Sequence, residues 1–458
     1  MARMLFVCAL LCAWPTYSPG QDSAGDTETI VRLTVQPMAA PVPALKYQLL
    51  PELREMNPGN PVQGYLKCFM EQQNFFFNPA SIQNQEKWST MPLHELPLKE
   101  LQDYGDVALR QADYAARLDT PDWQVLLLVK RDGAHVLLPD VQKLRALAAA
   151  LKVRFRARVA ERRFDEALTT AKTMFALARH FSEHPTVIAD LVGFACATVA
   201  LNPLEEMIAQ PGCPNLYWAL TVLPSPLVDM RKGMQGERLI SDIEFAFLDS
   251  SAPMSDAQLE KAVSQEDETL QMMEVGRKFK DWVQARVSNE ASVREARQRL
   301  IQHGLSAERV KDFPAKQVIL LDEKRDFEVR RDDALKWMAM PYPQVEAGLS
   351  VLQPSDNESP HWKMLVSYLG IRKAQARLDR RIALLRCVEA LRLYAAANDG
   401  KLPARLDDLS VPVPADPFTG KPFGYETKGQ IAILRAPPPR GEENIKPYNL
   451  RYEVTIKK

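Results

Sequence analysis

Apolar residues recur at helical spacing through the middle of the chain. Between residues 137 and 159 they fall at steps of three and four: Leu137, Val141, Leu144, Leu147, Leu151, Phe155 and Val159. This spacing places them on one face of an amphipathic helix. A second stripe follows, so we predict an antiparallel helical hairpin over 139–162 and 165–182. The almost continuous apolar stretch from Thr186 to Ile208 predicts a third helix, buried on most sides.

Proline placement marks where further long helices can form. Proline costs about 3 kcal/mol inside a helix, and none occurs at residues 140–184, 254–313, 315–340 or 361–402. Within these windows we predict helices over 256–302 and 315–340. Both carry dense charges of alternating sign, which is typical of a solvated face with ion pairs between residues four apart.

Alternation of apolar and polar positions predicts strands only toward the two ends of the chain. Residues 29–36 and 450–456 alternate in this way. Near the C-terminus, a helix is predicted over 378–397, because Asn398, Asp399 and Gly400 form a left-handed cap signal after it. Two strands are predicted over 423–427 and 430–435, on either side of a Lys428-Gly429 turn. The fold class is therefore mainly α, with a repeat-like helical-hairpin body and a small C-terminal α+β module.

The first residues have the pattern of an export signal. Arg3 precedes an uninterrupted apolar run over residues 5–14, and the small residues Ser18 and Gly20 follow it. Ten residues span about 15 Å as a helix, half of the hydrocarbon core of a bilayer, so the run suits a signal peptide better than an anchor. We predict cleavage after Gly20 and a secreted or periplasmic protein without a transmembrane segment. The alternatives are a buried N-terminal helix and lipid attachment at Cys8 or Cys12.

These patterns divide the chain into four parts. They are a signal peptide (1–20), an extended N-terminal segment with one strand (21–63), a helical domain (64–375) and a C-terminal helix-plus-sheet module (376–458).

Composition fits an ordinary globular protein. Of 458 residues, 46% are hydrophobic and 25% are charged, which excludes a wholly disordered, collagenous or polytopic membrane protein. The 58 basic and 58 acidic residues cancel, so no global field recruits nucleic acid. With only 19 glycines and as many as 34 prolines, the chain suits helices joined by rigid loops.

Signal cleavage leaves four cysteines, which allow three pairings in an oxidising compartment. Cys196 and Cys387 lie in apolar helical runs and are expected to be small core residues, whereas Cys68 with Cys213 is the more plausible disulfide. The absence of a CxxC pair or a His/Cys cluster from the sequence argues against a structural zinc site.

The most specific chemical pattern is His180-Phe181-Ser182-Glu183-His184. In an H-x-x-E-H helix, two imidazoles hold zinc and the Glu is the general base. The pattern resembles that of inverted-zincin peptidases, which implies Glu260 as the third ligand. However, Pro185 biases His184 away from helical dihedrals. The alternative is that both histidines only stabilise a helix C-terminus.

Two other groups of residues have functional interpretations that we weigh against packing. A basic run lies on the predicted hairpin at Lys152, Arg154, Arg156, Arg158, Arg162 and Arg163. It could bind an anionic partner, although we favour a solvated basic face. Tyr217 and Trp218 lie on a proline-bounded segment, where we expect them to fill space between helices rather than to bind a ligand.

Two stretches resemble parts of known families. Residues 161–185, ERRFDEALTTAKTMFALARHFSEHP, are similar to the second half of one tetratricopeptide repeat, but no copy follows at an offset of about 34 residues. Residues 391–409, LRLYAAANDGKLPARLDDL, and 416–426, DPFTGKPFGYE, look like the globular end of type II secretion pseudopilins. The methylated apolar helix with which those proteins begin is missing. The likeness implies a calcium site at Asp416, Thr419 and Glu426. The same residues are also typical of an ordinary turn without a bound ion, and we favour the turn.

A broader resemblance covers most of the chain. The signal peptide, ALKYQLLPEL at 44–53, PGCPNLYWAL at 211–220 and the DPFTGKPF ending resemble a family of uncharacterised secreted proteins from planctomycete-type bacteria. This resemblance implies export and supplies no catalytic residues.

The sequence therefore predicts an exported, non-enzymatic interaction or structural protein of the cell envelope, with a protein partner. It indicates no nucleic-acid partner and no cofactor. For each candidate catalytic or metal-binding residue, a structural role is favoured over a functional one. The alternative is an exported zinc-dependent hydrolase that uses His180, Glu183, His184 and Glu260.

Overall fold

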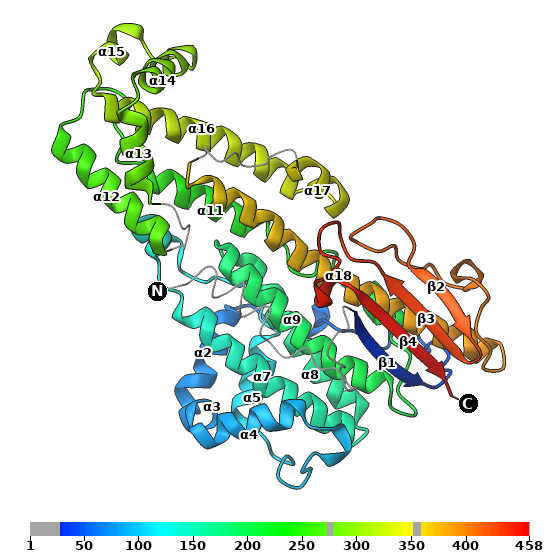
Figure 1. Ribbon diagram of the computed structural model, residues 1–458. Helices are drawn as coiled ribbons and strands as arrows, with labels where there is room; N and C mark the ends of the chain where they lie inside the picture. The colour runs from blue at the N-terminus through cyan, green and yellow to red at the C-terminus, as the bar shows by residue number, and fades with distance from the viewer. Residues whose placement is uncertain (1–27, 273–277, 351–358, 458) are drawn as a thin grey trace.

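The computed structural model describes residues 28–272, 278–350 and 359–457, and within them the chain is mainly helical with one small sheet. Figure 1 shows three regions: a helical body, a sheet that packs along one end of the long gold helix α18, and an arm of helices that projects from the opposite end. The predicted fold class is confirmed. The residues predicted to form an export signal, 1–20, lie outside the described residues.

The helices of the body precede the arm in the chain, except for the long helix that follows it. They are α2 (Pro61–Glu71), α3 (Gln73–Phe77), α4 (Pro79–Thr90), α5 (Asp106–Ala115), α6 (Leu126–Asp132), α7 (Pro139–Ala160), α8 (Phe164–His180), α9 (Val187–Ile208), α10 (Tyr217–Thr221), α11 (Arg231–Glu244) and α18 (Trp362–Ala397). The arm comprises α12 (Asp256–Met272), α13 (Phe279–Val287), α14 (Glu290–Gln302), α15 (Ala307–Asp312), α16 (Ala315–Met338) and α17 (Tyr342–Ser350).

The predicted hairpin and third helix are confirmed as α7, α8 and α9, which pack on one another. Arg162 adopts a left-handed backbone with φ 59°, which reverses the chain between α7 and α8. The Thr186 hydroxyl caps α9 by accepting a hydrogen bond from the Ala189 amide. Within the described ranges, α9 is the one helix long and apolar enough to cross a membrane. Since 83% of its most apolar window is buried, α9 has the environment of a core helix.

The sheet joins the two ends of the described chain. Its order is β1-β4-β3-β2, where β1 is Thr29–Val35, β4 is Leu450–Ile456, β3 is Ile431–Ala436 and β2 is Gly424–Lys428. β1 pairs with β4 in parallel, from Thr29 opposite Leu450 to Val35 opposite Ile456, and the other pairs are antiparallel. All four predicted strands are confirmed. The extended N-terminal segment thus completes the sheet of the C-terminal module.

The helix α18 is longer than predicted and links all three regions. It begins at Trp362 instead of Leu378 and runs from the base of the arm to the sheet (Figure 1). The early turns contain Arg372, Lys373 and Arg377, which interrupt the apolar stripe that predicted the helix. Some of the charges along α18 are buried because partners from other elements neutralise them. Arg380, for example, forms a fully buried ion pair with Asp416.

The arm confirms the prediction of helices with mixed charge on exposed faces. On α16, Arg330 pairs with Asp326, and Lys336 pairs with Asp333. At the tip, the Arg297 guanidinium of α14 donates hydrogen bonds to backbone carbonyls around the end of α15, including that of Phe313 at 2.8 Å. Exposed ion pairs contribute little stability, so the shape of the arm depends on packing between its own helices and on the contacts of α16 and α17 with α18.

Candidate functional site

A cleft of about 650 Å³ lies on the helical body, beside the turn between α7 and α8. One wall is the segment Met38–Tyr47, which we name the strap. The opposite walls are the α7–α8 turn at residues 162–166 and the loop at 212–215. The lining mixes apolar, aromatic and charged side chains, which is the composition of a binding surface that fixes a ligand by both shape and charge.

The N-terminal end of the strap is held by a buried arginine of α18. The Arg392 guanidinium is fully buried and forms an ion pair with Glu389 at 2.8 Å. It also donates hydrogen bonds to the backbone carbonyls of Gln36 at 3.0 Å and Cys213 at 2.7 Å. The Met38 amide in turn donates to the Arg392 carbonyl. One side chain therefore fixes the strap and the 212–215 loop, two walls of the cleft, against the same helix.

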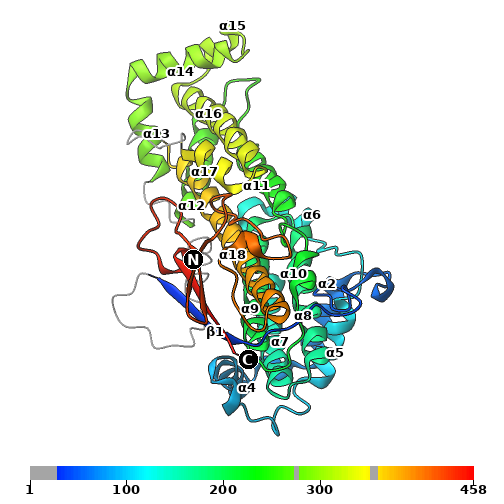
Figure 2. The same ribbon diagram turned by 90° about the vertical axis from the view of Figure 1, so that its right-hand side faces the viewer.

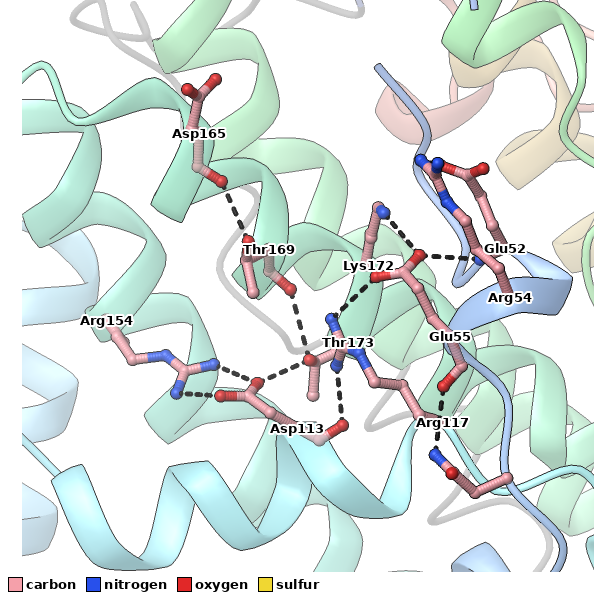
Figure 3. A network of polar contacts seen from close by, with 11 residues as sticks. Glu52, Arg54, Glu55, Asp113, Arg117, Arg154, Asp165, Thr169, Lys172 and Thr173 are labelled. Atoms are coloured by element: carbon pink, nitrogen blue, oxygen red, sulfur yellow. Dashed lines mark hydrogen bonds and ion pairs between the residues drawn. The ribbon is translucent and has the colours of Figure 1, made fainter. Parts of the chain in front are cut away.

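The chain beyond the other end of the strap is held by the network of Figure 3. The Glu55 carboxylate accepts hydrogen bonds from Lys172 of α8 at 2.7 Å and from the Glu52 amide at 2.8 Å, and Arg117 lies 3.6 Å away. Burial alone raises the pKa of Glu55, but these hydrogen bonds and the two cations hold that pKa below its ordinary value. Glu55 is therefore charged at neutral pH, and its ion pairs fasten the chain beyond the strap to the hairpin.

The same network ties three helices together beneath this fastening point. Asp113 of α5 accepts two hydrogen bonds from Arg154 of α7, at 2.6 and 2.9 Å, and a third from the Thr173 hydroxyl of α8 at 2.6 Å (Figure 3). The Arg117 guanidinium donates to the Asp113 carbonyl at 2.7 Å. A bidentate Arg–carboxylate pair constrains both position and orientation. The helices α5, α7 and α8 are therefore held together beside the Glu55 ion pairs.

Several charged side chains of the cleft have no ion-pair partner among the described residues and are available to a ligand. Arg162 donates to the Pro211 carbonyl at 2.5 Å, and Arg163 pairs with Glu161 and Glu166. By contrast, within the described part of the chain neither the Lys46 ammonium nor the Asp165 carboxylate forms an ion pair; Lys46 lies over the Tyr47 ring, 5.2 Å from its centroid. The cleft thus presents Lys46 and Asp165 on opposite walls, with Arg162 as a second cation that has no ion pair in the described chain and with aromatic and apolar surface beside them.

The structure does not assemble the predicted zinc ligands. The His180 Nδ1 atom hydrogen-bonds with the Tyr65 hydroxyl at 3.0 Å, and His184 Nδ1 does so with the Thr186 hydroxyl at 3.0 Å. Glu183 pairs at the surface with Lys232. Glu260 lies on α12 in the arm and pairs with Lys316. No group of three or more His, Cys, Asp or Glu residues is placed to hold a metal ion in residues 28–457 outside the two short undescribed stretches.

His184 is buried, His180 is half-buried, and both are neutral. Burial, with a smaller contribution from Arg179, lowers the pKa of His180 to about 3, and burial with Lys232 does the same for His184. As the proline at 185 predicted, His184 leaves the helix, with φ −84° and ψ 135°. Trp123 packs edge-on against His184 and donates to the His180 carbonyl at 3.0 Å. The His184 imidazole is thus part of the packing around Trp123, while the His180 imidazole packs against Tyr65.

The prediction of a solvated basic face on α7 is wrong for the residues within the helix. Arg156 is fully buried; it pairs with Glu206 at 2.7 Å and donates to the carbonyls of Trp88 and Met91. Arg154 and Arg158 pair with carboxylates and are mostly buried. Lys152 is also buried, and this burial lowers its pKa to about 8. The cations hold segments of the protein together, and only Arg162 and Arg163 are exposed.

The aromatic pair and the calcium candidate both have structural roles. Tyr217 is fully buried and donates to the Pro412 carbonyl at 2.5 Å, so the prediction that it fills space between segments is confirmed. Asp416 binds Arg380 through two hydrogen bonds of 2.9 and 2.8 Å and accepts one from the Phe418 amide, which forms the favoured turn. Glu426 pairs with Arg435 within the sheet, so the calcium set is not assembled.

The expected disulfide is also not formed. Cys68, Cys196, Cys213 and Cys387 are all free and buried. The Cys68 thiol faces the Gly64 carbonyl within its own helix, while the Cys213 thiol faces the Pro214 carbonyl in the loop beside the cleft. Their thiols therefore point to different neighbours. Burial raises the pKa of each of these thiols to about 12, which makes them unreactive core residues.

Sequence reasoning missed a buried charge cluster at the base of the arm. His361 lies between Glu266 of α12 and Glu323 of α16, with ring nitrogen to carboxylate distances of 2.6 and 3.0 Å. Three phenylalanines surround the imidazole: Phe245, Phe279 and Phe327. Burial alone lowers the pKa of His361, but the two carboxylates outweigh burial and raise it to about 9. No sequence pattern marks this site, because its partners lie 95 and 38 residues away.

Comparison with known proteins supplies no further guide. No protein-family model, no curated protein and no solved structure matches this chain. The function must therefore be inferred from the geometry described above.

Proposed function

We propose that the chain is an exported, non-enzymatic interaction protein of the cell envelope, and that it binds an extended peptide segment of its partner in the strap cleft. Export is inferred from the apolar run at residues 5–14 and the small residues after it. The tetratricopeptide-like stretch and the pseudopilin-like ending agree with a role in protein assemblies of the envelope.

The observation that carries the proposal is the preformed cleft with unmatched charges. Arg392 fixes one end of the strap and Glu55 fixes the chain beyond its other end. The cleft between them therefore keeps its shape without a ligand, which reduces the entropy lost on binding. Lys46 and Asp165 can pair with an acidic and a basic side chain of a peptide, while Tyr47 and Phe164 supply apolar contact.

The placement of the titratable groups favours binding over catalysis. Groups with strongly shifted pKa values mark catalytic sites when they line an accessible pocket. Here His180, His184 and His361 have strongly shifted pKa values, yet all three are away from the cleft lining, inside packed regions. The cleft itself holds no nucleophile with a base beside it.

A display selection tests this function. Short random peptides are selected on the full chain and counter-selected on the Lys46→Glu/Asp165→Lys double variant. We expect enriched peptides that combine an acidic and a basic residue and bind the variant at least about tenfold more weakly, because each lost ion pair becomes a repulsion. Lys316→Glu, which changes an arm residue paired with Glu260, is the control and should leave peptide binding unchanged. Selected peptides that bind all three proteins equally would contradict the proposal.

A further inference from the structure

The short helix α6 exposes its entire first turn of leucines. Leu127 is 78% exposed, and its neighbours Leu126 and Leu128 are exposed by 46% and 40%. Leu137, just beyond the helix, is 60% exposed. Scattered exposed leucines are common on soluble proteins, whereas several adjoining ones mark a surface that meets another apolar phase.

The rest of α6 is firmly mounted on the body, beside α11 (Figure 2). Val125 and Val129 are buried against Ile240 of α11. At the end of the helix, the Ala134 amide donates to the Glu244 carboxylate of α11 at 2.9 Å. Gly133 permits this contact, because its backbone is left-handed and a Cβ would lie only 2.5 Å from a Glu244 oxygen. The leucines are therefore held out by a fixed support.

Two exposed cations follow the leucines at the spacing of one helical turn. Lys130 and Arg131 lie three and four residues after Leu127, so they share its side of the helix about 5 Å further along the axis. Arg131 pairs with the neighbouring Asp132 and its side chain is still 70% exposed. An apolar tip with cations one turn behind it matches the order of acyl chains and anionic headgroups at the surface of a bilayer.

We propose that α6 is a membrane-contact element that inserts Leu126, Leu127 and Leu128 into the interface of a bilayer containing anionic phospholipids, with Lys130 and Arg131 at the headgroups. A helix that docks in a protein groove uses apolar residues at i, i+3, i+4 and i+7 along one stripe. Three successive leucines instead point about 100° apart around the axis, so only immersion of the whole turn removes all of them from water. This contact does not depend on the strap cleft.

A fluorophore placed on the helix tests insertion directly. An environment-sensitive dye is attached to Leu127→Cys and, as the matched control, to Leu53→Cys, since Leu53 is 90% exposed elsewhere on the body. Both proteins carry Cys8→Ser and Cys12→Ser, and the four cysteines of the described chain are buried. On addition of vesicles of phosphatidylcholine and phosphatidylglycerol, the dye at position 127 should shift to the blue, and the dye at position 53 should not.

Vesicle binding of unlabelled variants measures the strength of the contact. Leu127→Ser should weaken binding to the same vesicles at least about tenfold relative to Leu53→Ser, because the insertion of one leucine is lost. Lys130→Glu should remove much of the preference for anionic over pure phosphatidylcholine vesicles, by at least about fivefold. Unshifted emission at position 127, or equal binding by Leu127→Ser and Leu53→Ser, would overturn the proposal. The proposal would also be overturned if the unmodified chain did not bind vesicles but associated with itself, and if Leu127→Ser abolished this self-association. The leucines would then belong to a contact between copies of the chain.

Discussion

Two histidine regions of this protein have opposite electrostatics. His180 and His184 lie near Trp123 in the body, where hydroxyl groups face their Nδ1 atoms and burial lowers each pKa to about 3. His361 lies at the base of the arm between two carboxylates that raise its pKa to about 9. All three imidazoles are buried or nearly so. The difference shows that the partner brought by the fold, and not burial alone, decides whether a buried histidine is charged.

The comparison also shows which histidine a sequence pattern selects. The H-x-x-E-H motif drew attention to His180 and His184, whose Glu183 points to surface Lys232. No motif surrounds His361, yet it is the histidine with two carboxylate neighbours. A local motif is informative only if the fold keeps its members together, and here Pro185 takes His184 out of the helix.

The largest expected effect is from removing the charge at position 361. His361→Gln keeps a hydrogen-bonding side chain but leaves the Glu266 and Glu323 carboxylates buried without a cation. We expect a loss of about 3–5 kcal/mol in the free energy of unfolding, measured by chemical denaturation. His180→Gln is the matched control, since it replaces a neutral histidine, and it should lose about 1 kcal/mol. Equal losses in both variants would contradict the assigned charges.

Opposite pH windows give the second prediction. The folded-state pKa of His361, about 9, exceeds its unfolded value of about 6.5. The protonated imidazole therefore contributes fully to the free energy of unfolding below pH 6.5, and this contribution is lost as the pH rises through 9. This loss should be on the order of 3 kcal/mol and absent in His361→Gln. Besides its two partners, Glu244 of α11 interacts with His361.

For His180 and His184 the sign is reversed. Their folded-state pKa values are lowered to about 3. The contribution of these two neutral histidines to the free energy of unfolding is therefore complete above pH 6.5 and decreases as the pH falls toward 3. His180→Gln should reduce this acid sensitivity, and the charges of Arg179 and Lys232 near the two rings add to it. Denaturation midpoints between pH 4 and 10 for the unmodified chain and both variants measure the two windows. If the stability of His180→Gln falls at acid pH as steeply as that of the unmodified chain, the assignment of a neutral His180 is contradicted.

A smaller effect is expected from the hydroxyl beside His180. Tyr65→Phe removes the oxygen that lies 3.0 Å from His180 Nδ1, where Tyr65 is fully buried and His180 is half-buried. The variant should lose about 0.5–1.5 kcal/mol of unfolding free energy, the usual net value of one hydrogen bond. Thermal unfolding followed by circular dichroism measures it. A loss above about 3 kcal/mol would mean that Tyr65 holds more than this one hydrogen bond.

The smallest expected effect is the response to zinc. Because the Nδ1 atoms of His180 and His184 face hydroxyl groups and Glu260 lies in the arm, added zinc should leave the unfolding temperature unchanged. A ligand present at about 100 times its dissociation constant would instead add about 2.7 kcal/mol. Stoichiometric zinc in the purified protein, lost in His180→Ala, would establish the hydrolase alternative.

The fold was predictable where each helix carries its own apolar period. The stripe from Val141 to Val159 predicted α7 almost to the residue, and alternation predicted β1 and β4. Where long-range partners neutralise charges, the pattern was misleading: Arg156 looked like a solvated residue but binds Glu206 in the core. In α18 the charges of the early turns concealed sixteen residues of helix, from Trp362 to Arg377.

The candidate site was not predictable from the sequence, for the same physical reason. Its walls come from residues 38–47, 162–166 and 212–215, which only tertiary packing brings together. Arg392, which holds two of these walls, lies in an apolar helical run. Its partners include the backbone carbonyls of Gln36 and Cys213, and no sequence pattern identifies them because every residue has a backbone carbonyl.

The protonation states of the individual histidines provide the most direct test of this account. Imidazole nitrogen-15 chemical shifts, assigned by the three single substitutions and followed by NMR against pH, report the charge on each ring. We predict that His361 stays protonated through neutral pH and titrates near 9, while His180 and His184 stay neutral down to at least about pH 5. A neutral His361 at pH 7, or a His180 or His184 that titrates near 6.5, would contradict the account.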